Sequence, residues 1–161
     1  ETMQTGSHRG DPAVEILDEV ATLVVKHGVG IGSLTLAQRE LALAVPALAL
    51  APGVICSEVE INKLLLRVLA AEAVYLRTDH VELRRWLIDS GWWRRDGFGR
   101  TYERTPAAQL RLPLSLIERS LRGLDLAKWA AQHQDKARAA REAKQATWAA
   151  RSRALGASAR G

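Results

Sequence analysis

The chain has 161 residues, 47% of them apolar, and a formal net charge of +5. This length supports one ordinary hydrophobic core, so we expect one compact domain with tails. No apolar run reaches the roughly 20 uncharged residues that a membrane span needs. The single cysteine, Cys56, excludes an internal disulfide and a cysteine-rich zinc site. We therefore expect a soluble, cytoplasmic protein that does not contact membranes.

The excess positive charge lies at the C-terminal end. Residues 1–124 hold fifteen Lys/Arg and fifteen Asp/Glu, whereas residues 125–161 hold eight basic and three acidic residues. At the other end, we expect residues 1–10 to be disordered or derived from cloning, so the fold prediction leaves them out.

Residues 11–52 are predicted to form an N-terminal helical region. Asp11 and Pro12 are typical of a helix start and predict a helix over about 12–27. Thr35 can cap a second helix, which must end or bend near Pro46 because proline lacks the amide donor. The apolar stretch that follows fits either a short buried helix or an extended segment.

Residues 53–106 are predicted to form a winged-helix-like centre. Ser57 and Glu60 make a capping box, which starts a helix that runs to about Ala71. A second helix is expected over 79–90, stopped by Gly91.

Two short strands that cover 92–95 and 100–104 would then form a β-hairpin. Strand alternation places Trp92 and Trp93 on opposite faces, so we expect one of them to be partly exposed. Helix, helix and basic hairpin together are the outline of a winged helix.

Residues 107–161 are predicted to hold a short helix around 114–121 and a long Ala-rich helix from Leu126 to about Ala154, capped by Asp125. The large apolar anchors on the long helix are Trp129 and Trp148, so the helix either projects or folds fully only on a partner. The expected fold class is mainly α with a small β-hairpin, a winged-helix-like centre and a long C-terminal helix.

The chain carries no motif for catalysis. Its four histidines are scattered with no supporting motif, and no G-x-S-x-G sequence is present. Asp79, His80 and Glu82 lie close together in the sequence. Acidic residues at a helix start interact favourably with the helix dipole, and this explains the cluster more simply than a metal site does. We therefore expect no catalytic residue, no metal site, no cofactor and no enzyme activity.

Basic residues predict a nucleic-acid-binding surface instead. In a winged helix the second helix and the hairpin are the surfaces that meet DNA, and the basic tail can add phosphate contacts. The candidate residues are Arg84, Arg85, Arg94, Arg95, Arg100, Arg104, Lys136, Arg138, Arg141 and Lys144. Alternatively, the helix and hairpin arginines pair with neighbouring acidic residues, namely Asp79, Glu82, Asp89, Asp96 and Glu103.

Four aromatic residues are candidate anchors for a partner: Trp93, Phe98, Trp129 and Trp148. Phe98, at the tip of the hairpin, is the one most expected to be exposed. Core packing is the better interpretation for Trp86 and Tyr102.

Residues 57–104 resemble a bacterial family, the domain of unknown function 2087. The shared pattern comprises Glu60, Ile61, Asn62, Asp79, Leu83, Arg84, Arg85, Leu87, Gly91, Arg95, Asp96, Gly99, Tyr102 and Arg104. The resemblance implies a bacterial, regulatory setting, because that domain occurs in transcriptional regulators, sometimes behind an ArsR-like helix-turn-helix. It transfers no catalytic residues. Trp93 and the long basic tail depart from the family pattern.

Two functions are therefore expected from different classes. The first is a nucleic-acid-binding transcriptional regulator that contacts DNA, in preference to RNA, through the helix over 79–90, the hairpin over 92–104 and the basic tail. The alternative is an assembly subunit, in which the C-terminal helix docks on a second copy, a protein partner, or RNA in a ribosome.

Overall fold

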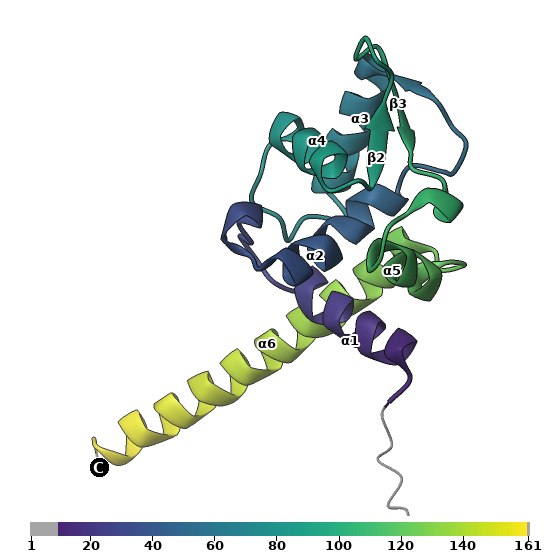
Figure 1. The fold of residues 1–161 in the computed structure, drawn as a ribbon. Coiled ribbons are helices and arrows are strands. Elements are labelled where there is room, and N and C mark those ends of the chain that lie inside the picture. The colour runs from purple at the N-terminus through teal and green to yellow at the C-terminus, as the bar shows by residue number, and fades with distance from the viewer. Residues whose placement is uncertain (1–9, 161) are drawn as a thin grey trace, which may run out of the picture.

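The computed structural model describes residues 10–160 (Figure 1). The segment expected to be disordered or cloning-derived, 1–10, thus lies almost wholly outside the described residues. The described chain contains helices α1 (Pro12–Val24), α2 (Leu36–Leu48), α3 (Glu58–Leu69), α4 (His80–Asp89), α5 (Leu114–Leu121) and α6 (Leu126–Ser158), with strands β1 (Cys56–Ser57), β2 (Trp93–Arg95) and β3 (Thr101–Arg104). The predicted fold class, mainly helical with a small sheet and a long C-terminal helix, is confirmed.

Polar caps set where the helices begin. In α1, α2, α3, α4 and α6 the residue before the helix accepts a hydrogen bond from a backbone N–H of the first turn. α1 ends at Val24, three residues before the predicted end. The chain leaves the helix there because Val29 pairs with the segment around Leu76: Val29 N donates to Tyr75 O, and Arg77 N donates to Val29 O, both at 2.9 Å.

Helix α2 continues through Pro46 to Leu48, two residues beyond the proline that was expected to end or bend it. Proline has no N–H, so the carbonyl of Ala42, four residues earlier, loses its helical donor. The buried Tyr75 hydroxyl donates to that carbonyl at 2.5 Å. Burial raises the pKa of the Tyr75 phenol, which therefore remains protonated and able to donate.

We expect Tyr75→Phe to lower the free energy of unfolding by about 1–3 kcal/mol, because it leaves a buried carbonyl without a donor. In a Pro46→Ala background the restored backbone N–H supplies that donor, so the same substitution should cost less. Urea unfolding of the four proteins of this cycle measures both costs. An equal cost in the two backgrounds would show that Tyr75 does not substitute for the missing amide.

The sheet has the strand order β1-β3-β2 and is antiparallel throughout. The predicted hairpin is present as β2 and β3, with Arg95 opposite Tyr102. Strand β1 was not predicted, because a strand of two residues is too short to show a periodic pattern. It pairs with β3, far away in the sequence, with Cys56 opposite Tyr102. Helices α3 and α4 pack on each other, and they contact β3 and β2 respectively, so the predicted helix, helix and hairpin form one unit.

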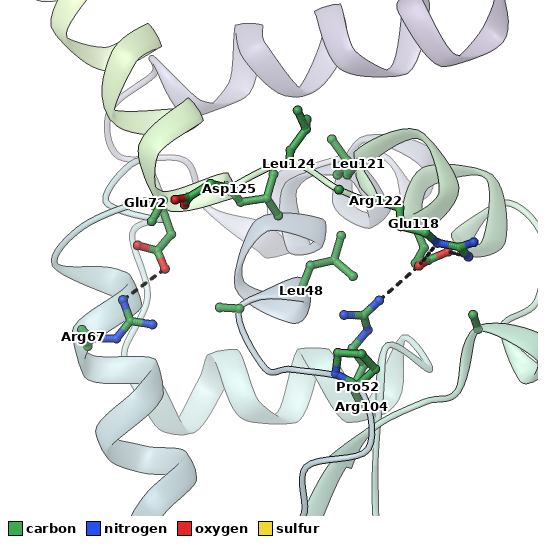
Figure 2. Close-up of a pocket in the computed structure, with 15 residues that line it drawn as sticks. Leu48, Pro52, Arg67, Glu72, Arg104, Glu118, Leu121, Arg122, Leu124 and Asp125 are labelled. Carbon is green, nitrogen blue, oxygen red and sulfur yellow. Dashed lines mark hydrogen bonds and ion pairs between the residues drawn. The ribbon is translucent and has the colours of Figure 1, made fainter.

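The C-terminal helices attach to the N-terminal ones. Helix α5 packs on α1 and α2, and the first turns of α6 pack on α1, while the remainder of α6 projects away from the body (Figure 1). Every residue from 138 to 160 is exposed. Ion pairs between Arg67 and Glu72 and between Arg104 and Glu118 flank the junction with α5 and α6 (Figure 2).

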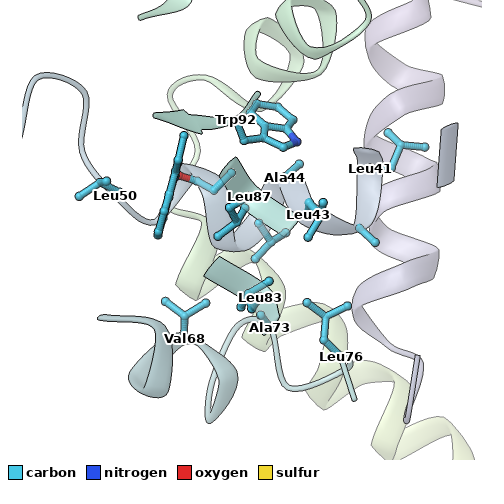
Figure 3. Packing of buried hydrophobic residues seen from close by; sticks show 14 of the residues in the cluster. Leu41, Leu43, Ala44, Leu50, Val68, Ala73, Leu76, Leu83, Leu87 and Trp92 are labelled. Atoms are coloured by element: carbon cyan, nitrogen blue, oxygen red, sulfur yellow. The ribbon is translucent and has the colours of Figure 1, made fainter. Parts of the chain in front are cut away.

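Both neighbouring tryptophans belong to the core. Trp92 is 0% and Trp93 is 1% exposed, so the expectation that one of them is exposed is wrong. Trp92 precedes the first residue of β2, so strand alternation does not govern its direction. Both rings reach α2: Trp92 Nε1 donates to Glu40 O at 3.3 Å, and Trp93 Nε1 donates to Ala47 O at 2.9 Å. Figure 3 shows Trp92 among the leucines and alanines of this core.

Candidate nucleic-acid interface

A groove of about 360 Å³ separates α4 from the hairpin. Asp79 caps α4 by accepting from Glu82 N at 2.7 Å, which fixes the start of the helix and hence the direction of its arginines. The groove is lined by Arg84, Arg85, Ile88, Asp89, Arg95 and Tyr102. The structure thus brings three of the six predicted helix and hairpin arginines to one place.

Arg84 forms one wall of the groove and is tied to its own fold. Its Nη1 donates to Asn62 Oδ1 at 2.7 Å and to Glu58 Oε1 at 3.3 Å, and its guanidinium lies 5.4 Å from the centre of the Tyr102 ring. These contacts join α3, α4 and β3. Arg84 therefore holds the walls of the groove together, and its charge is already engaged by Glu58.

Three arginines around the groove and the hairpin tip are exposed: Arg85, Arg95 and Arg100. Within residues 10–160 none of them makes an ion pair. These charges remain available to an anionic partner.

The loop that carries Arg100 is held by Asp96. Asp96 Oδ1 accepts from Arg100 N at 2.7 Å and from Thr101 N at 3.3 Å, and the Arg100 bond is the main cause of the lowered pKa of this carboxyl group. The Arg100 guanidinium lies 5.6 Å from the centre of the Phe98 ring. Phe98 is 84% exposed, so the expected exposed aromatic at the hairpin tip is present.

Arg94 and Arg104 point elsewhere. Arg94 lies on the other face of β2, where it pairs with Glu103 at 2.7 Å and with Gln109 at 2.7 Å. Arg104 reaches α5 and pairs with Glu118 at 3.2 Å; burial lowers its pKa, and Glu118 opposes that effect. For Arg94 the pairing alternative is correct, whereas Arg104 is paired with a residue, Glu118, that this alternative did not name. Of the partners found for helix and hairpin arginines, only Glu103 was predicted, because Glu58 and Glu118 lie far away in the sequence.

The candidate aromatic anchors also divide into residues that pack within the chain and residues that are exposed. Trp93 is buried and cannot anchor a partner. Trp129 is half-buried against the core, with its ring centre 4.6 Å from that of His133, so it docks α6 on its own chain. Trp148 is 72% exposed on the projecting part of α6. Phe98 and Trp148 are the accessible members of the set.

A second basic surface lies on α6. Its candidate residues are all exposed: Lys136, Arg138, Arg141 and Lys144. Arg138 contacts Asp135 at 3.0 Å in an exposed pair that contributes little. The hairpin tip and the end of α6 lie at opposite ends of the molecule (Figure 1), so the two basic surfaces are separate.

The described residues contain no group of three or more His, Cys, Asp or Glu that could hold a metal ion. In the same part of the chain, no helix combines the length and the apolar character needed to span a bilayer.

Residues 35–104 match the family model described as an uncharacterized protein conserved in bacteria (DUF2087). This segment, which is less than half of the chain, is similar to that family. The match runs from Thr35, the cap of α2, to Arg104, the end of β3, so the DUF2087 segment includes α2, which the resemblance over 57–104 left out. It contains the groove between α4 and the hairpin but not the basic surface of α6. Searches of curated proteins and of solved structures found no match.

Proposed function

We propose that the protein is a nucleic-acid-binding regulator whose principal contact surface is the groove between α4 and the hairpin. The observation that carries the proposal is the exposure, without acidic partners in the described chain, of Arg85 and Arg95, which line the groove, and of Arg100 at the hairpin tip. Arginine binds phosphate oxygens in bidentate geometry and is the common reader of guanine edges. The proposal assigns binding and not catalysis to the chain.

The shape of this surface suits duplex DNA. An α-helix fits the major groove, which is about 12 Å wide, and α4 with its 10 residues is about 15 Å long. Arg85 on α4 would then face base edges or phosphates, while Arg100 at the hairpin tip would face the adjacent backbone. Phe98 is placed to contact a sugar or to insert beside a base.

The basic surface of α6 supplies a second contact in this proposal. Its exposed lysines and arginines lie on a helix that extends from the body, and phosphate contacts of this kind do not depend on sequence. We expect α6 to raise overall affinity, and the groove to contribute whatever sequence preference exists.

Fluorescence anisotropy of a labelled duplex DNA, repeated with a duplex RNA of the same sequence, tests this proposal. Each neutralised phosphate adds about 0.9 to the negative slope of log affinity against log salt, so the three unpaired arginines, Arg85, Arg95 and Arg100, give a slope near −2.7. We expect binding at low salt, a slope at least this steep and tighter binding to DNA. Absence of binding at low salt, or affinity independent of salt, would overturn the proposal.

A second candidate function rests on the exposed apolar residues of α6. Trp148 and Leu155 are 72% and 73% exposed and lie seven residues apart, which places them on one helix face. This arrangement favours an assembly subunit whose projecting helix docks on another chain. Light scattering after size-exclusion chromatography separates the two candidates: a salt-insensitive oligomer that does not bind nucleic acid would favour assembly.

A further inference from the structure

A cavity of about 690 Å³ lies where the DUF2087 segment meets α5 and the start of α6 (Figure 2). Its walls come from the ends of α2 and α3, from β3, from α5 and from the first turn of α6. A volume of this size is typical of sites for small molecules. The cavity shares no lining residue with the groove between α4 and the hairpin.

One end of the cavity carries carboxylate groups. The Glu72 side chain is only 3% exposed, and its Oε1 contacts Arg67 Nη1 at 3.4 Å. Its other oxygen, Oε2, is buried and has no hydrogen-bond partner among residues 10–160. Buried carboxylate oxygens are nearly always bonded, because leaving one without a donor costs free energy. Figure 2 draws Asp125 at this end too, so two carboxylates accompany one guanidinium, that of Arg67, and the end favours a cationic donor.

The opposite end carries positive charge. Glu118 is already paired with Arg104 at 3.2 Å and with Arg122 at 2.5 Å, so one carboxylate faces two guanidinium groups. The Arg104 side chain is 12% exposed, and only its Nη2 donates to Glu118 in the described chain. Its remaining N–H groups can therefore serve an anion in the cavity.

Between the two ends the lining is apolar. Figure 2 shows Leu48, Leu121 and Leu124 between the Glu72 end and the Arg104 end. A ligand that fits both ends must carry opposite charges separated by an apolar chain. A simple amine would leave the arginine end unmatched, a fatty acid would meet Glu72 with like charge, and an α-amino acid holds its two charges too close together.

We propose that this cavity binds a small zwitterion, an ω-amino acid or a short peptide. Its ammonium group pairs with the carboxylates at the Glu72 and Asp125 end, its carboxylate accepts from Arg104, and its chain contacts the leucines. The ligand would lie between the DUF2087 segment and the two C-terminal helices. This inference is independent of nucleic-acid binding.

Isothermal titration of the full chain with ε-aminocaproate, trialanine, n-hexylamine and hexanoate tests the proposal. We expect ε-aminocaproate or trialanine to bind tenfold or more tightly than n-hexylamine and hexanoate. Tighter binding of ε-aminocaproate identifies the ligand class as an ω-amino acid, and tighter binding of trialanine identifies it as a short peptide. Equal binding of n-hexylamine or of hexanoate would overturn the two-ended site, and so would the absence of binding by all four.

Two pairs of variants locate the site. Glu72→Gln should weaken zwitterion binding tenfold or more, whereas Glu142→Gln on the exposed part of α6 should leave it unchanged. Ala127→Trp lies on the exposed first turn of α6, where it fills the cavity without touching the core, and it should abolish binding; Ala139→Trp is its matched control. Circular dichroism verifies that each variant is folded. Undiminished binding by folded Ala127→Trp protein would show that the ligand does not occupy this cavity.

Discussion

Replacing Arg85, Arg95 and Arg100 together by glutamine is expected to weaken DNA binding tenfold to a hundredfold at low salt, to order of magnitude, and to lower the salt slope by up to about three. The physical reason is that these guanidinium groups are exposed and have no acidic partner in the described chain. Their loss should leave the fold intact for the same reason. Anisotropy titrations at several salt concentrations measure both the affinity and the slope.

The matched control is Arg94→Gln. Arg94 lies on the same hairpin, but its charge is already paired with Glu103 at 2.7 Å, so its loss should change DNA affinity much less. If Arg94→Gln weakened binding as much as the triple substitution, the effect would reflect the total charge of the hairpin and not the groove. If the triple variant kept full affinity, the groove would not be the contact surface.

Trp93→Ala should lower the free energy of unfolding by about 3–5 kcal/mol, since it removes a large buried side chain. It also removes the indole donor that satisfies the Ala47 carbonyl, which belongs to the last turn of α2 and has no donor within the helix. Trp93 joins the hairpin to α2, so the hairpin should lose order together with the helix.

Phe98→Ala supplies the comparison for Trp93→Ala. Phe98 is an aromatic residue of the same hairpin but is 84% exposed, so its loss should change stability by no more than about 0.5 kcal/mol. Urea unfolding monitored by circular dichroism measures both variants. Similar, small effects for the two would contradict the burial of Trp93.

Local signals in the sequence predicted most of the secondary structure. The caps at Thr35, Ser57, Asp79 and Asp125 marked helix starts correctly, because capping depends on residues within one turn of each other. The bounds 114–121 for α5 were also correct. The features that were missed depend on contacts between distant segments: β1 pairs with β3, and both tryptophans bond to α2.

The candidate site was predictable in composition but not in geometry. A concentration of arginines on one helix and one hairpin indicated the region in which the structure forms a groove. Which of them are free depends on Glu58 and Glu118, which approach Arg84 and Arg104 only in the folded chain. The ion-paired cavity beneath the DUF2087 segment left no signal in the sequence, because its lining comes from four separate stretches, 48–52, 67–72, 104–107 and 118–127.

The central claim is that nucleic acid contacts the groove between α4 and the hairpin. Amide chemical-shift mapping by NMR, with labelled protein titrated with a duplex DNA at moderate salt, tests it most directly. We predict that the largest shifts fall in α4 and in the loop between β2 and β3, with smaller shifts along α6. Shifts confined to residues 138–160 of α6, with none in α4 or the hairpin, would contradict the claim.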